Sequence, residues 1–161
     1  MEHWRFHELN SVSLSPFSAG SGGICYNDTM QEPSIFTRII NGEIPCHKIY
    51  EDDKVIAFLT ITPVADGHTL VVPKVQVDQL WDLEADDYDY LWKTAQKIAV
   101  HLRTVMHVDR VGVVVKGFEV PHAHIHLIPV NFHSGLGFDP DPPPSIADNS
   151  TLVAIAERIR L

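Results

Sequence analysis

The sequence lacks several features that mark particular classes of protein. Its 161 residues include only two cysteines, Cys25 and Cys46, which form neither a disulfide-scaffold pattern nor a C-x-x-C metal pair, so reduced thiols are expected. No apolar run approaches the roughly 18 residues of a membrane span, and no basic start followed by an apolar stretch marks a secretory signal. Because 12 basic side chains stand against 21 acidic ones, no broad positive field is present to attract nucleic acid or an anionic membrane. The sequence therefore predicts a cytoplasmic protein with no nucleic-acid partner and no membrane partner.

The chain is long enough for one packed core with tails, since 45% of its residues are hydrophobic. Residues 1–33 are Ser- and Gly-rich and are predicted to be a disordered N-terminal extension; Met30 raises the alternative that residues 1–29 result from a misassigned start. Residues 34–132 carry the regular patterns of a domain. Residues 133–161 are predicted to complete it with a Pro/Gly-rich loop and a C-terminal helix.

Hydrophobic periodicity predicts both helices and strands. The predicted elements, in chain order, are a short helix over 34–44, two strands within 47–61, a third strand within 66–74, a long helix over 82–106, two strands over 110–118 and 119–130, and a helix within 145–160. The long helix is the clearest, because its apolar residues recur at three- and four-residue steps and its charges suit the helix dipole. A hairpin is expected near Gly117, and the sum is one α+β domain.

The stretch PHAHIHLIPV, residues 121–130, places His122, His124 and His126 at alternate positions. On a helix, residues two apart would face nearly opposite ways, whereas on a strand they share one face. The intervening residues are then free to face the core. The spacing therefore predicts that all three imidazoles lie on one face of a strand.

Three explanations of this cluster are open from the residues alone. Two strand histidines can chelate zinc, but a stable site needs three or four ligands, and no C-x-x-C or H-E-x-x-H motif accompanies them. Pure packing is disfavoured because every neutral imidazole needs partners for two ring nitrogens. Phosphoryl chemistry suits the cluster best, because one imidazole can attack phosphorus while its neighbours hold it and neutralise charge on the transferred group.

PHAHIHLIP resembles the H-φ-H-φ-H-φ-φ signature of the histidine triad (HIT) superfamily, where φ is apolar. The segment IFTRIINGEIPCHKIYEDDKVIAFLTITPVADGHTLVVPK resembles the N-terminal half of the same family. The resemblance implies an α+β, HIT-like fold: an antiparallel five-stranded sheet with a long helix packed on it and a C-terminal helix. It also implies a nucleotide hydrolase or nucleotidyltransferase that acts at the α-phosphate of nucleoside phosphoramidates, dinucleoside polyphosphates or related nucleotides.

By position in the motif, His124 is expected to be the nucleophile that forms a nucleotidyl-histidine intermediate. His122 and His126 are expected to orient it, bind phosphate and assist the leaving group, and His68 in DGHTLVVP matches a further active-site histidine. The resemblance implies a purine nucleotide substrate, held by residues that on their own pattern would be assigned to the core or to a loop. These expected nucleotide-binding residues are Ile35, Phe36, Ile39, Phe58, Leu59, Thr60, Ile61, Lys116, Glu119 and Val120. A homodimer that joins two sheets is also expected.

The sequence departs from the family pattern at two groups of positions. Ser34, Thr37 and Gln76 stand where many bacterial relatives have zinc ligands, so no structural metal and no cofactor are predicted. Thr60 replaces an aspartate that binds ribose, which should weaken the grip on its hydroxyls. Lys116 and Glu119 replace an asparagine and a hydroxyl residue in a shortened loop. These changes motivate an alternative function, a non-catalytic nucleotide-binding regulatory module.

Overall fold

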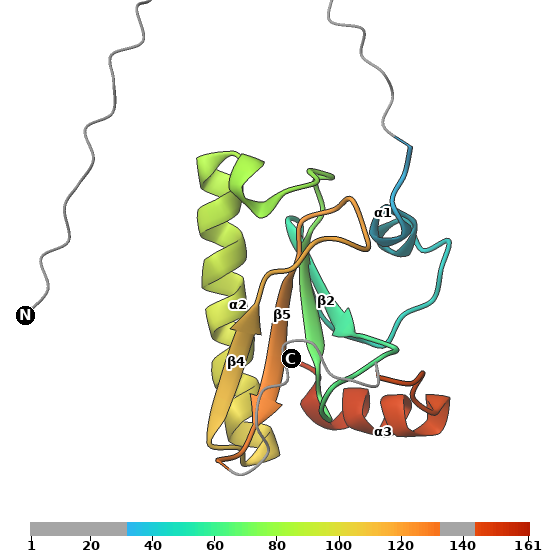
Figure 1. The fold of residues 1–161 in the computed structure, drawn as a ribbon, viewed down its shortest axis with the longest axis vertical. Coiled ribbons are helices and arrows are strands. Elements are labelled where there is room, and N and C mark those ends of the chain that lie inside the picture. The colour runs from blue at the N-terminus through green and yellow to red at the C-terminus, as the bar shows by residue number, and fades with distance from the viewer. Residues whose placement is uncertain (1–31, 133–143) are drawn as a thin grey trace, which may run out of the picture. The chain divides into compact units, whose positions relative to one another are not determined.

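The computed structural model describes residues 32–132 and 144–161, so residues 1–31 of the predicted N-terminal extension and most of the Pro/Gly-rich loop lie outside the described residues (Figure 1). The elements are α1 (Ile35–Ile40), β1 (Lys48–Glu51), β2 (Val55–Leu59), β3 (Thr69–Pro73), the 3-10 turn η1 (Leu80–Asp82), α2 (Ala85–Met106), β4 (Arg110–Val114), β5 (Ile125–Val130) and α3 (Asn149–Ile159). Each predicted helix and strand is therefore present, with shorter bounds than the sequence pattern gave.

The strands form one five-stranded sheet in the order β1-β2-β3-β5-β4, and every neighbouring pair is antiparallel. This confirms the predicted α+β class and the antiparallel five-stranded sheet. The predicted pairing of the last two strands is also confirmed, with Val114 opposite His126 at the end where the connecting loop begins. Gly117 in that loop has φ +73, a conformation that glycine adopts without a steric penalty.

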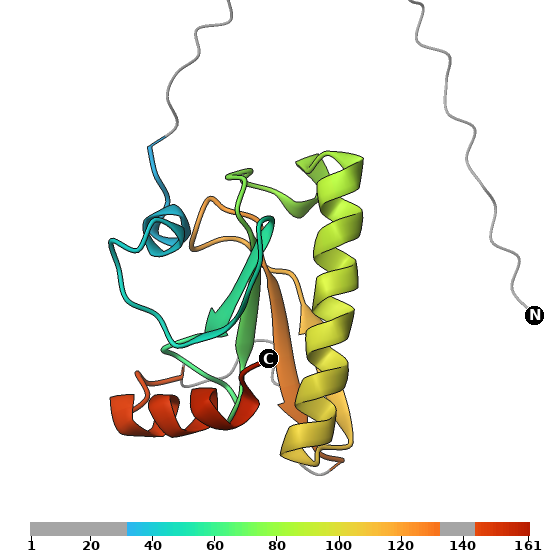
Figure 2. The same ribbon diagram turned by 180° about the vertical axis from the view of Figure 1, so that it is seen from behind.

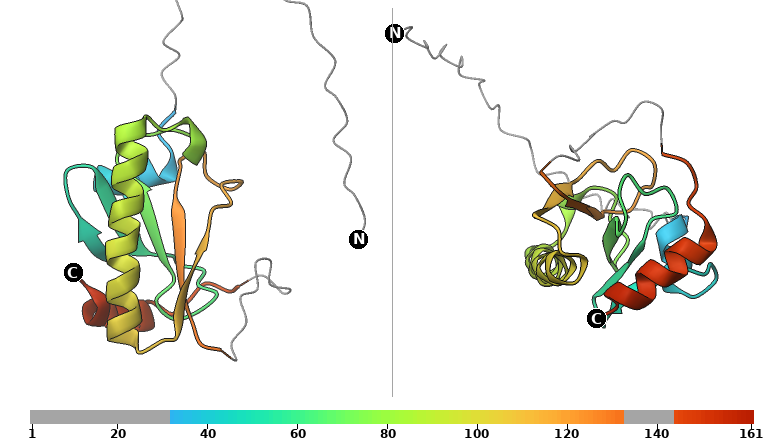
Figure 3. Two further views of the ribbon diagram at one scale, coloured as in Figure 1. Left: turned by 90° about the vertical axis from the view of Figure 1, so that its left-hand side faces the viewer. Right: turned by 90° about the horizontal axis from the view of Figure 1, so that it is seen from below.

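The two faces of the sheet bury different sets of side chains. On one face Val55, Ala57 and Leu59 of β2 join a core that includes apolar residues of α2 and α3. On the other face Ile56 and Phe58 pack with Phe36 of α1. Figures 2 and 3 show α2 along one side of the sheet and α1 on the opposite side. Alternation along a fully buried strand thus divides the molecule into a structural face and a face that holds the candidate site.

Helix α1 is short, and its ends are set by side chains next to it. The Ser34 hydroxyl accepts a hydrogen bond from the backbone N–H of Thr37 and caps the start of the helix. The helix ends at the Asn-Gly pair, where Gly42 has φ +78. The sequence predicted this stop correctly.

The triad segment differs from the prediction that all three histidines lie on one strand. Only His126 belongs to β5, which begins at Ile125; His122 and His124 lie in the segment that leads into the strand. The neighbouring strand β3 ends at Pro73, and Ala123 donates its backbone N–H instead to the carbonyl of Val77, which lies beyond that end. The ladder with β3 therefore begins only after the second histidine.

None of the helices in the described ranges is both long and apolar enough to cross a membrane.

Candidate functional site

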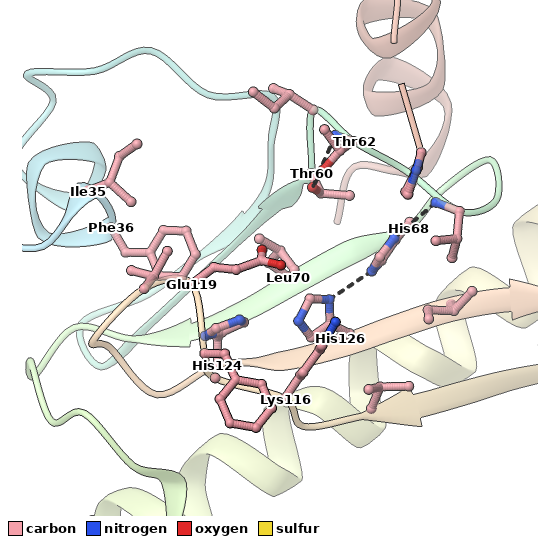
Figure 4. A pocket seen from close by; sticks show the side chains of 18 residues that line it. Ile35, Phe36, Thr60, Thr62, His68, Leu70, Lys116, Glu119, His124 and His126 are labelled. Atoms are coloured by element: carbon pink, nitrogen blue, oxygen red, sulfur yellow. Dashed lines mark hydrogen bonds between the residues drawn. The ribbon is translucent and has the colours of Figure 1, made fainter. Parts of the chain in front are cut away.

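A cavity of about 580 Å³ lies on the α1 face of the sheet (Figure 4). It is lined by Ile35, Phe36, Thr60, Ile61, Thr62, Val64, His68, Leu70, Val114, Lys116, Gly117, Phe118, Glu119, Val120, His124, His126, Ile128 and Pro144. The volume falls within the range of pockets that hold a ligand of nucleotide size. Three imidazoles, one ammonium group and one carboxylate therefore share a cavity whose other walls are largely apolar.

His124 is held in one tautomer by a backbone carbonyl. Its Nδ1 lies 2.8 Å from the carbonyl oxygen of His122, and because a carbonyl only accepts, Nδ1 must carry the proton. The Nε2 of the neutral ring then has a free lone pair. The edge of the Phe36 ring packs against this imidazole at a centroid distance of 5.0 Å, and only 6% of His124 is exposed. The imidazole of His124 is thus fixed in position, and it lines the cavity with the lone pair of Nε2 unprotonated.

His68 and His126 form a second chain of fixed tautomers. The backbone N–H of Val64 donates to Nδ1 of His68 at 3.3 Å, so that in the neutral ring the proton sits on Nε2. This Nε2 lies 2.9 Å from Nδ1 of His126 and donates to it, as Figure 4 shows. His126 must then carry its own proton on Nε2. One backbone amide therefore makes His126 a hydrogen-bond donor through its remaining nitrogen.

Burial keeps these imidazoles neutral. It lowers the pKa of His68 to about 4. The pKa of His126 falls to about 3, first through burial and then through the charges of His124, His68 and Lys116. Burial also lowers the pKa of His124, while the carbonyl of His122 and the charge of Glu119 act in the opposite direction. At neutral pH the site therefore contains uncharged rings, one of which offers a lone pair and another an N–H.

His122 lies beneath the cavity wall, within a closed hydrogen-bond network. Its Nε2 donates to the carbonyl of Pro73 at 2.8 Å, so its Nδ1 accepts, and the Ser34 hydroxyl donates to Nδ1 at 2.8 Å. The Thr37 hydroxyl donates to Oε1 of Gln76, which also accepts the backbone N–H of Ser34 at 2.9 Å. Ser34, Thr37 and Gln76, the three positions that depart from the family's metal ligands, thus bind His122 and one another through hydrogen bonds.

The described residues contain no group of three or more His, Cys, Asp or Glu side chains arranged to hold a metal ion. The chemistry of the network agrees with this finding. Hydroxyl and amide groups replace the soft ligands that zinc prefers, and the Nδ1 lone pair of His122 is already used by Ser34.

The structure brings together most of the residues that the sequence predicted for the site. Those that line the cavity are His68, His124, His126, Ile35, Phe36, Thr60, Ile61, Lys116, Glu119 and Val120. His122, Ile39, Phe58 and Leu59 do not line it. Phe58 supports the cavity from behind, because its ring packs against Phe36 at 5.7 Å, whereas Leu59 faces the core on the opposite side of the sheet.

Several lining residues were not predicted from the sequence. They are Thr62, Val64, Leu70, Val114, Gly117, Phe118, Ile128 and Pro144. Ile128 could have been found, since it lies two residues after His126 on the same strand and therefore on the same face. Leu70 pairs with Phe58 across the β2–β3 ladder, and no local pattern indicates that pairing.

Comparison with known proteins agrees with this fold. The sequence model of the HIT domain matches residues 41–133. An uncharacterised HIT-like protein of Borreliella burgdorferi is 38% identical over 65% of this chain and 80% of its own length. A purine nucleoside phosphoramidase of Escherichia coli is 35% identical over 66% of this chain and 100% of its own length.

A solved structure shows the same fold. The HIT-like protein of Bartonella henselae, described as involved in cell-cycle regulation, superposes with a TM-score of 0.68 at 33% identity and covers 79% of this chain and 94% of its own. Together with the triad and the five-stranded sheet, these matches show that the chain belongs to the HIT family.

Proposed function

We propose that the protein is a hydrolase or nucleotidyltransferase that acts at the α-phosphate of a nucleoside phosphoramidate, a dinucleoside polyphosphate or a similar nucleotide. The observation that carries the proposal is the hydrogen bond from Nδ1 of His124 to the carbonyl of His122, because it leaves the Nε2 lone pair available in a ring that lines the cavity. The phosphoramidase name of the Escherichia coli relative supports the same class of reaction.

The chain's own groups account for two steps. In the first, Nε2 of His124 attacks phosphorus, and the bond from phosphorus to the leaving group breaks to give a nucleotidyl-histidine. The N–H of His126 stabilises charge on a phosphoryl oxygen. In the second step, water attacks the same phosphorus and His124 regains its electron pair. The His122 carbonyl holds the Nδ1 proton throughout and so keeps the nucleophile in one orientation.

The apolar wall offers a place for a purine base. Phe36 and Leu70 line the cavity with buried side chains, and Ile35 and Ile61 line it with exposed ones. The Thr60 and Thr62 hydroxyls lie 3.4 Å apart and can accept or donate single hydrogen bonds to a ribose. Such hydroxyls bind a diol less tightly than a carboxylate would, so we expect the base and the phosphate to supply most of the affinity.

Incubation with an adenosine phosphoramidate tests the proposal. The wild type should release the nucleoside monophosphate, and intact-protein mass spectrometry after an acid-free quench should detect a nucleotidyl adduct. His124→Ala should abolish both, with a loss of at least about 1,000-fold in turnover, because the nucleophile is gone. His47→Ala is the control, since it removes an imidazole that does not line the cavity.

The alternative is a nucleotide-binding regulatory module without catalysis. Thr60 favours this alternative, because a threonine lacks the carboxylate that would bind the ribose hydroxyls. Glu119 favours it too, because its negative charge lines the cavity and would repel a phosphate group. Tight nucleotide binding, together with turnover no greater than that of His124→Ala, would support this alternative and refute the enzyme.

We also propose a homodimer, formed through β4 and α2. Strand β4 lies at the edge of the sheet, and Val113 on it is 45% exposed. On α2 the indole Nε1 of Trp92 is buried without a hydrogen-bond partner among the described residues. A second copy can extend the sheet at this edge and cover these apolar side chains.

A further inference from the structure

Glu119 is the one feature of the cavity that conflicts with simple phosphate binding. Among the described residues that line the cavity it is the only carboxylate, and Lys116 is the only ammonium group. Its side chain points into the cavity in Figure 4. A site built only to hold anions would gain nothing from a fixed negative charge on its wall.

The two charges act on different imidazoles. The charge of Glu119 favours the protonated form of His124, whereas the charge of Lys116 disfavours the protonated form of His126. The carboxylate therefore acts on the nucleophile's side of the cavity. Positive charge that develops there is stabilised, and additional negative charge is opposed.

Positive charge does develop there in the proposed reaction. When Nε2 of His124 bonds to phosphorus while Nδ1 keeps its proton, the ring becomes cationic. This stabilisation is the same for every substrate, because every substrate passes through the same nucleotidyl-histidine. Substrates differ in the leaving group. An amine leaves without negative charge, whereas a polyphosphate carries several negative charges into the cavity.

We propose that Glu119 selects substrates by the charge of the leaving group, favouring amines bonded to phosphorus through nitrogen over polyphosphates. The inference rests on the proposed function and narrows its substrate class to nucleoside phosphoramidates. Phosphoramidates whose amine also carries a positive charge are the best substrates. Such an amine avoids the repulsion that a polyphosphate would meet, and its positive charge is attracted to the carboxylate of Glu119.

The bond changes balance without any further reactant. The lone pair of His124 Nε2 forms the new bond to phosphorus, the electron pair of the old phosphorus–nitrogen bond stays on the leaving nitrogen, and that nitrogen takes up one proton from solvent water. Water then attacks phosphorus, the electron pair of the His124–phosphorus bond returns to Nε2, and the attacking water releases one proton to solvent, which replaces the proton taken up in the first step. The products are an amine and a nucleoside monophosphate.

The test compares two substrates with the same nucleoside, adenosine phosphoramidate and diadenosine tetraphosphate. The readout is the ratio of their kcat/KM values, in which the common effect of Glu119 on the intermediate cancels. Glu119→Gln should shift the ratio toward the tetraphosphate by about tenfold, since one unit charge acts on several others across a partly solvated cavity. The shift should shrink as salt is added.

Glu157→Gln is the matched control, because it removes the same charge from an exposed position on α3 that does not line the cavity. It should leave the ratio unchanged. A ratio in Glu119→Gln that stays within twofold of the wild type would refute the selection, even if both substrates are turned over. A wild type that turns over neither substrate refutes the proposed function itself, so the two failures are distinguishable.

Discussion

Replacement of Ser34 by alanine tests whether the hydrogen-bond network beneath the site stabilises the fold. The Ser34 hydroxyl makes two contacts at once: it accepts from the backbone N–H of Thr37 at 3.1 Å and donates to Nδ1 of His122 at 2.8 Å. The substitution removes an N-cap, which costs about 1 kcal/mol. It also leaves the buried Nδ1 of His122 without its donor, which costs about 1–3 kcal/mol more. We expect the free energy of unfolding to fall by roughly 3 kcal/mol.

Asp148 provides the control for the capping contribution. Its carboxylate accepts from the backbone N–H of Thr151 at 3.2 Å and caps α3, but it is exposed and forms no hydrogen bond with a histidine among the described residues. Asp148→Ala should therefore lower the free energy of unfolding only by the loss of a cap, and by clearly less than Ser34→Ala does. Urea unfolding followed by circular dichroism measures both variants, provided that the m-values match.

The difference between the two variants measures the bond to His122. The Thr37 hydroxyl lies 3.4 Å from the same Nδ1 and could turn toward it, but it would then give up its bond to Gln76. Such a rotation would restore a donor to His122 but would remove one from Gln76, so the total number of hydrogen bonds would not recover. Equal destabilisation by Ser34→Ala and Asp148→Ala would refute the reasoning and would show that the bond to His122 adds nothing.

Two further predictions concern acid stability and assembly. The pKa of His68 in the folded state is about 4, below its ordinary 6.5. The neutral side chain therefore contributes its full stabilisation above pH 6.5, and this contribution of about 3 kcal/mol is lost as the pH falls toward 4. His68→Asn should flatten the dependence of the unfolding free energy on pH in that window, and an unchanged slope would contradict the assignment. Val113→Lys should convert a dimer to a monomer in light scattering coupled to size exclusion, because it places like charges at the edge of β4. A wild type that already elutes as a monomer would refute the homodimer.

Much of the fold followed from local patterns, for identifiable reasons. The long helix was predictable because its apolar stripe and charge order agree with each other, and the stop of α1 was predictable from an Asn-Gly pair. The bounds of β5 were not, because they depend on where β3 ends at Pro73 and on a bond from Ala123 to Val77. Pairing partners far apart in the chain leave no local signal.

The candidate site shows the same division between local and long-range information. Alternate spacing identified the three triad histidines, and the resemblance supplied His68 and the other lining residues that were predicted. The remaining lining residues, Ile128 among them, were not predicted. The tautomers were beyond the sequence, since they depend on the amide of Val64 and the carbonyl of His122. His122 was expected to bind phosphate, yet its ring is fully buried and does not line the cavity. The period of two cannot reveal this, because the segment reaches regular strand geometry only after His124.

This placement of His122 gives the three histidines of the motif different physical tasks. In the proposed reaction His124 supplies the lone pair and His126 supplies an N–H, and both side chains line the cavity. His122 contributes through its carbonyl, which fixes the proton on His124, while its ring binds Ser34 and the carbonyl of Pro73 and thereby holds that carbonyl in place. A network of uncharged hydroxyl and amide groups suffices for this task, because a neutral imidazole in a fixed tautomer needs only one donor and one acceptor. The side chains at Ser34, Thr37 and Gln76 therefore provide what the proposed nucleophile needs without a metal, whereas Glu119, which lines the same cavity as Lys116, is the residue that we propose selects the leaving group.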